Sequence, residues 1–370
     1  MKTEHLRFLI ILSLLLITSC DSESLQSSQA TPNNLPLYQL SVADSFGVEI
    51  GDSLNMIGSI NGYFSFSDGS IVLLDAVARK IRIVQENGNA SCYGSTGGGP
   101  GEMASPKSMC VMPDGRILVA DDYKCLVMEY DISGRYLGNY LESEWKIPEH
   151  FLPIDSNSLV GVVFDVEFCD GEIEGFNFYV GRFDSSPEPS VRYIEVRRGM
   201  SDPSLYTQID ILDFEVDPNG LVYIVPDHTD YIINVLSSDG TVQRQICPEV
   251  DRLAKTGEEL AIELSEFEEN HIWDSAYTGG YEPLPYHKLI TLVGVDADRN
   301  LWVQRMDAKD KFTFDVWNLS GDLQFRASLE KFTSNPDLEF HADENGILGA
   351  ITDSDVHSRV YRLEMLEQSN

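Results

Sequence analysis

Apolar and polar residues alternate along much of this chain in short runs, and Asp-Gly or Asn-Gly pairs separate many of the runs. Such alternation is typical of β-strands that bury one face. Gly and Asn adopt positive φ at little cost, so these pairs predict tight hairpin turns. The clearest copy of the pattern covers residues 109–121 and 126–134, and a second covers 214–225 and 232–240. We therefore expect an all-β fold built from repeated hairpins.

The pattern recurs six times. Weaker copies lie at residues 64–75, 292–303 and 340–349, and the poorest, at 152–160, keeps the turn chemistry without glycine. Where the copies are closest, their spacing is near the roughly 40 to 50 residues of a four-stranded propeller blade. Radial repetition also protects the edges of small sheets. The sequence therefore predicts a six-bladed β-propeller over residues 36–370.

Closure of this ring needs a strand from the other end of the chain. After the sixth copy only one clear strand remains, at residues 359–366, so the last blade lacks its fourth strand. The alternating run at residues 37–42 is placed to supply it. We expect the N-terminal strand to complete the last blade.

A long interval between the fourth and fifth copies predicts an insertion at about residues 249–287. Thr256 and Glu259 form a capping box, which is a signature of a helix N-terminus. Leu260, Leu264 and Phe267 follow at the spacing of one buried helical stripe. The insertion is expected to contain a short acidic helix.

The first twenty residues predict a secretory signal, since a charged start precedes a short apolar run and small residues. The apolar run, 8–17, is too short for the roughly twenty residues of a transmembrane helix. Residues 17–20 resemble the lipobox of bacterial lipoproteins, so residues 1–19 would be the signal peptide and Cys20 would carry the lipid. Residues 20–35 are polar and predict a flexible tether. The expected location is the cell envelope, on either the inner or the outer membrane.

The net charge of the chain limits the kinds of partner that it can bind. With 26 Lys and Arg against 60 Asp and Glu, the formal net charge is −34. A polyanion of this kind repels nucleic acid. We therefore expect no nucleic-acid partner, and a membrane partner only through the lipid on Cys20.

A family resemblance is carried by one stretch of the chain. Gly98-Gly-Pro-Gly-Glu102 precedes Pro113-Asp-Gly115, Val119-Ala-Asp121 and Tyr130-Asp131. This order resembles the NHL repeat and the bacterial six-bladed β-propeller lipoproteins related to it. The full motif covers about residues 97–135, and a diluted form covers most of the remaining chain. The resemblance implies the propeller fold and leaves the ligand open.

Two sets of residues are candidate metal sites. NHL-type propellers include a lyase with a central zinc held by three histidines, and His150, His287 and His341 fall near inner strands of different blades. Neutral imidazole suits zinc. Asp296-Ala-Asp-Arg-Asn300 has the alternate oxygen spacing of a calcium loop, but it also stands where the other copies have their hairpin turn. No cofactor is predicted; zinc or calcium is the alternative.

Aromatic residues gather in the insertion. Trp273, Tyr277, Tyr281 and Tyr286 follow the predicted helix, and aromatic side chains recur at interaction sites. The alternative is that they pack the insertion onto the propeller. The sequence favours a non-catalytic binding or scaffold module for a protein, peptide or glycan. An extracytoplasmic metal-dependent enzyme, a lyase or a lactonase-type hydrolase, is the second hypothesis.

Overall fold

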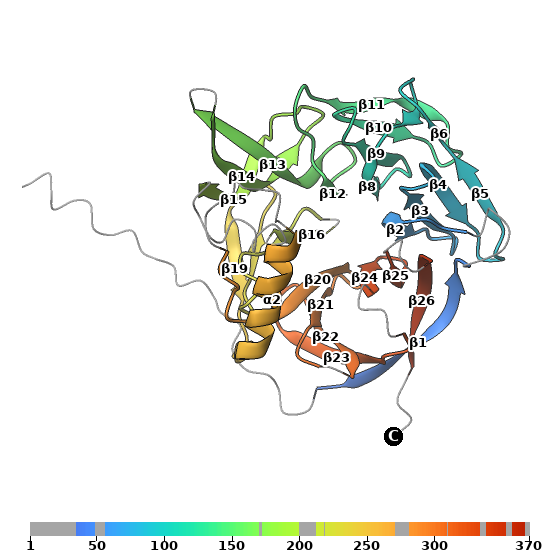
Figure 1. The fold of residues 1–370 in the computed structure, drawn as a ribbon. Coiled ribbons are helices and arrows are strands. Elements are labelled where there is room, and N and C mark those ends of the chain that lie inside the picture. The colour runs from blue at the N-terminus through green and yellow to red at the C-terminus, as the bar shows by residue number, and fades with distance from the viewer. Residues whose placement is uncertain are drawn as a thin grey trace, which may run out of the picture.

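The chain forms sheets arranged around a central axis, as in a propeller (Figure 1). The computed structural model describes residues 35–48, 56–169, 172–199, 212–217, 219–270, 281–308, 310–333, 338–352 and 357–366. Within these ranges all regular structure is β except one helix, α2 (Gly257–Asn270). The predicted all-β, propeller-like arrangement is confirmed.

Four sheets are separate, four-stranded and antiparallel, and in each of them every strand pairs with its neighbour in the sequence. The first contains β2 (Ile60–Ser65), β3 (Ile71–Asp75), β4 (Lys80–Val84) and β5 (Ala90–Tyr93). The second contains β8 (Pro106–Val111), β9 (Ile117–Asp121), β10 (Leu126–Tyr130) and β11 (Tyr136–Glu142). A small parallel pair, β6 (Ser95–Thr96) and β7 (Glu102–Met103), lies between them in the sequence.

The third and fourth sheets follow the same order. The third contains β12 (His150–Pro153), β13 (Leu159–Cys169), β14 (Glu172–Phe183) and β15 (Val191–Gly199). The fourth contains β16 (Asp213–Val216), β17 (Val222–Val225), β18 (Ile233–Leu236) and β19 (Val242–Ile246).

The remaining strands form one closed eight-stranded barrel, where the sequence predicts two separate blades. It contains β20 (Ile290–Val295), β21 (Leu301–Arg305), β22 (Lys311–Trp317), β23 (Leu323–Glu330), β24 (Leu338–Asp343), β25 (Gly346–Ile351), β26 (Arg359–Leu366) and β1 (Leu37–Phe46). Two parallel contacts close it: β20 meets β24 at Gly294 and Ala342, and β1 meets β23.

Gly294 explains the first of these contacts. Its φ is +142°, and a Cβ at this position would lie 1.8 Å from the Ala342 carbonyl oxygen. Only glycine lets the two backbones approach so closely. The barrel therefore depends on a missing side chain that the hairpin pattern does not reveal.

The predicted pairing of the two chain ends is confirmed. β1 runs antiparallel to β26, with Gln39 opposite Leu366 and Phe46 opposite Val360. On its other edge β1 is parallel to β23 over three residues. β1 thus connects β26, the last strand of the chain, to β23, the last strand of the antiparallel series β20 to β23.

Neighbouring sheets share their cores. One buried cluster joins Leu118 of the second sheet to Phe151 of the third. Another joins Leu73 of the first sheet to Leu348 of β25, so the first and last parts of the chain are packed together. Each sheet buries its faces against both neighbours, which is the arrangement that the repeat pattern predicts.

The turns also follow the predicted chemistry. Gly69, Gly115 and Gly220 have positive φ, and so does Arg299 in the 296–300 turn. There the Asn300 amide donates to Asp296 Oδ1 at 2.8 Å, and the Trp302 indole donates to Oδ2 at 2.9 Å. The oxygens of Asp296 are thus used in the hairpin, as expected for a turn.

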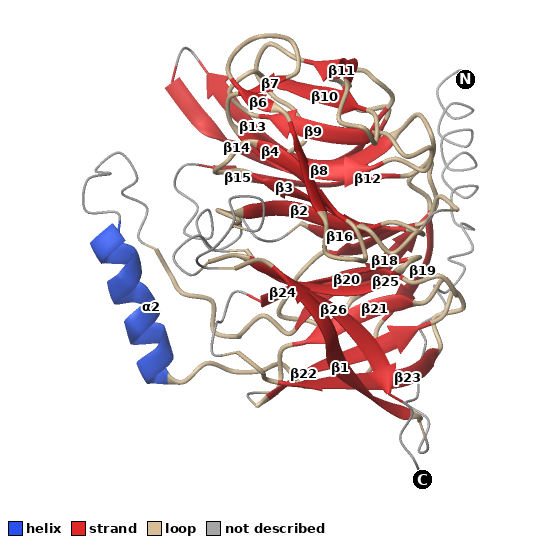
Figure 2. Cartoon of the chain, turned by 90° about the vertical axis from the view of Figure 1, so that its right-hand side faces the viewer, coloured by secondary structure: helices blue, strands red, loops and turns tan. Residues whose placement is uncertain are grey.

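Helix α2 begins with the predicted capping box. The Thr256 amide donates to Glu259 Oε2 at 2.7 Å, and the Glu259 amide donates to Thr256 Oγ1 at 3.2 Å. The predicted apolar stripe is only half-buried, because the helix stands beside the sheets rather than between them (Figure 2).

The first prediction tests ring closure. Leu40 of β1 is 2% exposed within the barrel core, whereas Val42 on the same strand is 38% exposed. Leu40→Ala should lower the free energy of unfolding by about 2–5 kcal/mol, because it leaves a cavity. Val42→Ala, the matched control, should change it by less than about 1 kcal/mol. Urea unfolding measures both; equal effects would contradict the role of β1 in closing the ring.

Candidate functional site

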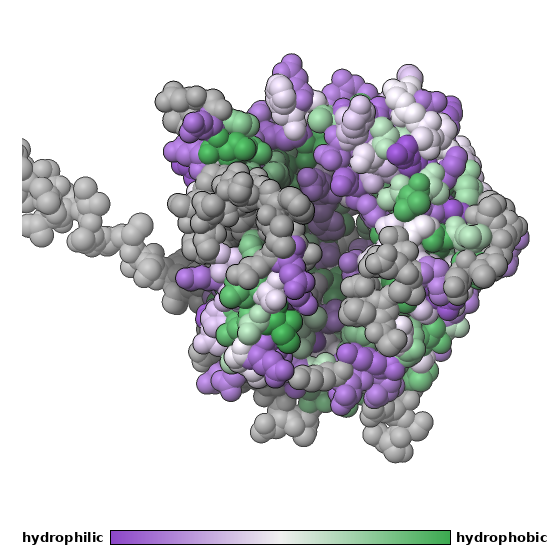
Figure 3. Space-filling view, viewed as in Figure 1, coloured by the Kyte–Doolittle hydropathy of each residue, from purple (hydrophilic) through white to green (hydrophobic). Residues whose placement is uncertain are grey.

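A pocket with polar and apolar walls lies on the axis of the molecule and occupies about 880 Å³. All six innermost strands line it, namely β2, β8, β12, β16, β20 and β24, as do residues just before β2, β12 and β20 and residues of the barrel strands β21 and β22. The pocket therefore opens on the face where these strands begin. Figure 3 shows the hollow in the middle of this face. Its volume is within the range of small-molecule sites.

Phe64 of β2 lies at the wall of this pocket. Its side chain packs against three buried clusters. One lies between the first and second sheets, one between the second and third, and one between the third and fourth. Its ring also meets His341 edge to face, with centroids 4.8 Å apart. One aromatic ring thus connects several sheets at the axis.

Three carboxyl groups of the innermost strands line the pocket, Asp213 and Glu215 from β16 and Glu339 from β24, and Glu149, just before β12, is a fourth. Burial raises the pKa of Asp213, although the nearby charges of His228 and Lys288 oppose the shift. Burial, followed by the charge of Asp213, raises the pKa of Glu215 well above its ordinary value. The site therefore holds carboxyl groups whose ionised forms are poorly compensated.

Glu215 is the most confined of the three. It is 8% exposed and forms no ion pair with any residue that the structure describes. Tyr63 lies close by: burial, and then the charges of Glu339 and Glu215, raise the pKa of its hydroxyl well above the ordinary value. In contrast, Asp213 accepts a hydrogen bond from the Leu292 amide at 2.7 Å.

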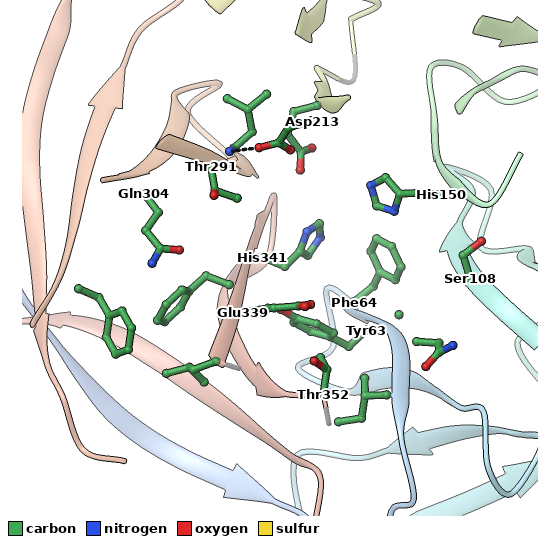
Figure 4. Close-up of a pocket in the computed structure, with 18 of the residues that line it drawn as sticks. Tyr63, Phe64, Ser108, His150, Asp213, Thr291, Gln304, Glu339, His341 and Thr352 are labelled. Carbon is green, nitrogen blue, oxygen red and sulfur yellow. Dashed lines mark hydrogen bonds between the residues drawn. The ribbon is translucent and has the colours of Figure 1, made fainter. Parts of the chain in front are cut away.

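Two of the three predicted histidines, His150 and His341, line the pocket (Figure 4). Burial lowers the pKa of both imidazoles, and the charge of Asp213 partly opposes this for His150. His287 lies elsewhere, beside α2, with its Nε2 3.5 Å from Glu259. The structure therefore does not bring the three histidines together, because the insertion carries His287 away from the axis.

No group of three potential metal ligands occurs among the described residues. The pocket does hold unsatisfied polar atoms. Ser108 Oγ, Arg305 Nε and His341 Nε2 are buried at its wall without a hydrogen-bond partner in the described part of the chain. Buried polar atoms are nearly always bonded, and exceptions gather at functional sites.

The predicted aromatic surface is only partly described. Trp273 and Tyr277 lie outside the described residues. Tyr281 stacks on Phe267 of α2 at 4.0 Å between centroids, and its hydroxyl donates to Glu263 at 2.6 Å. Tyr286 faces the Arg252 guanidinium at 5.1 Å. The described contacts of these two rings thus lie within the insertion, and the predicted ligand surface stays a prediction.

Cys20, the predicted signal peptide and residues 21–34 of the predicted tether also lie outside the described residues, whereas Leu35, its last residue, packs against a buried cluster of the fourth sheet and the barrel. Among the residues that are described, no helix has the length and apolarity needed to cross a membrane.

The carboxyl groups of the pocket were not singled out from the sequence. They carry a signal nonetheless: in β16 the polar residues Asp213 and Glu215 alternate with apolar ones, and in β24 Glu339 and His341 do the same. Polar residues at every second position of a strand share one face of its sheet, so they can gather at one site.

Neither a protein-family model nor a curated protein matches this sequence. Solved structures with a similar fold include a protein of Bacteroides fragilis NCTC 9343 described as exported, at 11% identity, TM-score 0.47 and coverage of 92% of this chain and 99% of that one. Another is the virginiamycin B lyase of Staphylococcus aureus with quinupristin, at 10% identity, TM-score 0.47 and coverage of 89% and 100%.

A third is a gluconolactonase of Xanthomonas campestris, at 13% identity, TM-score 0.41 and coverage of 88% and 97%. At these identities and TM-scores none of the three carries its own activity over to this chain. The molecule is thus an all-β, propeller-like protein with a polar pocket on its axis.

The second prediction concerns Glu215 and pH. The folded protein holds the Glu215 proton more tightly than the unfolded chain, whose Glu pKa is about 4.3. Its contribution to stability is therefore present below that pH and is lost as the pH rises through the raised pKa. Glu215→Gln cannot ionise, so its unfolding free energy relative to the wild type should increase from pH 4 to pH 8.

Chemical unfolding at several pH values measures this difference. Glu172→Gln, on the exposed part of β14, controls for the loss of one negative charge. A Glu215→Gln difference that is constant with pH would contradict a raised pKa at this position.

Proposed function

We propose that residues 36–370 form a six-bladed β-propeller in which the eight-stranded barrel is two neighbouring blades. Within the barrel, antiparallel pairing joins β20 to β23 in sequence order, and it joins β24 through β26 to β1. The six innermost strands contact one another in cyclic order, from β2 through β8, β12, β16, β20 and β24 and back to β2. Both observations support six blades around one axis.

The proposed location is the cell envelope, with the propeller held at a membrane by a lipid on Cys20. This rests on the charged, apolar and small-residue order of residues 1–20. A diacylated cysteine buries far more chain than a single myristoyl group, whose binding is marginal. The anchor would therefore be stable.

The third prediction tests that anchor. Cys20→Ala should move the protein from the membrane fraction to the soluble fraction, because the acyl chains can no longer be attached. Fractionation and immunoblotting measure the distribution. Cys92→Ala, a change at a half-buried cysteine of the first sheet, is the control. A Cys20→Ala protein that stays with the membrane would contradict the lipid anchor.

The proposed activity is the binding of a ligand that places a protonated amine in the axial pocket. The observation that carries this proposal is Glu215, a buried carboxyl with no ion pair among the described residues. Burying an unpaired ionised carboxylate is costly. A bound ammonium group would remove this cost, and it would also lie near the carboxyl group of Asp213.

The surrounding walls suit a ligand with mixed chemistry. Apolar groups such as Phe312 and Phe340 line the pocket alongside Ser108, Thr291 and Gln304. Such a surface can bind both the carbons and the polar atoms of a ligand. Of the protein, peptide or glycan ligands considered from the sequence, a peptide with a free N-terminus meets these requirements directly.

Catalysis is the second candidate function. Its support is the pair of pocket histidines, whose lowered pKa keeps them neutral and able to act as bases, together with Asp213 beside His150. Neutral imidazoles could also contribute to a zinc site, although the described residues bring only two histidines to the pocket. A catalyst acting on a bound ligand would release altered material, whereas a binding module would release it intact.

The fourth prediction tests amine binding. Tetrapeptides built only from uncharged amino acids are prepared as two pools: one amidated at the C-terminus, which is cationic, and one also acetylated at the N-terminus, which is neutral. The full-length protein should retain the cationic pool about tenfold better, measured by equilibrium ultrafiltration and mass spectrometry. The retained peptides should be recovered intact, because binding alone is proposed.

Glu215→Gln should abolish the preference for the cationic pool. Glu172→Gln, which removes an exposed carboxylate away from the pocket, is the matched control and should leave the preference unchanged. Equal retention of the two pools by the wild-type protein would contradict the proposed function.

A further inference from the structure

Four lysines line the axial pocket of this strongly acidic protein: Lys107, Lys288, Lys311 and Lys331. All four are exposed to solvent. None forms an ion pair within 4.0 Å with a residue that the structure describes. In a chain with 60 acidic and 26 basic residues, unpaired ammonium groups gathered at one pocket need an explanation.

Two of them are adjacent and lie away from the axis. Lys311 begins β22, and Lys331 follows the last residue of β23. The Lys331 amide donates to the Asp310 carbonyl at 3.5 Å, and its ammonium lies 5.6 Å from the centroid of the Phe312 ring. Lys311 is opposite Glu330 in the register and shares its face of the sheet, whereas Lys331 lies on the face of Phe312. Both lysines line this part of the pocket, which we call its cationic end.

The pocket reaches this end along one sheet. Its lining passes from Thr291 on β20 to Gln304 on β21, then to Phe312 on β22 and finally to Lys331 after β23. Figure 4 shows Thr291 and Gln304 on the side of the cavity opposite Ser108. The pocket is thus an arm that runs outward from the axis rather than a simple central hole.

The length of this arm limits its ligand. Neighbouring strands lie roughly 4.8 Å apart, so the path from β20 to β23 spans about 14 Å. An extended chain covers about 3.3–3.6 Å per residue. The arm beyond β20 therefore matches roughly four residues of extended peptide, and β16, which carries Glu215, contacts β20 at its inner end.

Nearby acidic groups leave the two lysines available. Asp307, in the loop before Lys311, is bound by Arg305, whose guanidinium also lies 3.8 Å from Asp315. Glu330 is opposite Lys311 in the strand register, but no ion pair joins them among the described residues. The cationic end is consequently not neutralised by the protein.

We infer that the axial pocket binds a short zwitterionic peptide, with its N-terminal ammonium at Glu215 and its C-terminal carboxylate at Lys311 and Lys331. This inference rests on the proposed amine binding and adds a second, separate contact. The arm supplies the apolar Phe312 and Phe340 and the amide of Gln304 between the two charged ends. A ligand with only one charge would leave one end of the pocket unpaired.

The fifth prediction separates this inference from the proposed function. A third tetrapeptide pool, with both termini free and uncharged side chains, is compared with the C-amidated and the doubly blocked pools on the full-length protein. We expect the zwitterionic pool to be retained roughly three- to tenfold better than the amidated pool. The double variant Lys311→Met/Lys331→Met should lose this gain but still prefer the amidated pool over the blocked one.

Arg135→Gln is the charge control for that variant, because Arg135 is 74% exposed, lies outside the pocket and pairs only with Asp131 among the described residues. The Arg135→Gln protein should still retain the zwitterionic pool better than the amidated pool. Equal retention of the zwitterionic and amidated pools, or a gain that survives in the double lysine variant, would overturn the inference and leave the proposed function intact. Retention of neither pool above the blocked one would overturn both.

Discussion

The structure depends on the mutual burial of sheet faces around one axis. No single four-stranded sheet here could bury both of its faces alone, and the buried clusters that include four-stranded sheets draw residues from two sheets, as Leu118 with Phe151 and Leu73 with Leu348 do. Such an arrangement is stable only when the ring is complete, since an open end would expose two apolar faces. β1 completes it, because it pairs with β26 on one edge and with β23 on the other.

The same constraint creates the candidate site. The innermost strands meet around the axis, and polar side chains that line the pocket there are partly withdrawn from water. Asp213, Glu215 and His341 occupy such positions, and burial shifts the pKa of each toward its neutral form. The ring thus holds polar groups in a partly desolvated place, and the proposed binding of a ligand with compensating charge rests on this.

Much of the fold could be predicted from the sequence, since hairpin turns, the pairing of the chain ends and the α2 capping box depend on local residue chemistry. The barrel could not, because the contact of β20 with β24 depends on Gly294 approaching a residue far along the chain. The site was only partly predictable. His150 and His341 were found, but His287 was grouped with them because strand proximity in sequence does not show where the insertion carries it. Glu215 was missed although its alternation with buried neighbours marks it.

The most direct test of this account is the pKa of Glu215, followed by carbon-13 nuclear magnetic resonance of labelled carboxyl groups and assigned with Glu215→Gln. In the free protein the resonance should titrate well above the usual glutamate range. When the zwitterionic tetrapeptide pool is added, its pKa should fall, because a bound ammonium stabilises the ionised carboxylate. A Glu215 resonance that titrates at the ordinary value, or whose pKa does not change when the pool is added, would contradict the claim that this buried carboxyl group binds a cation.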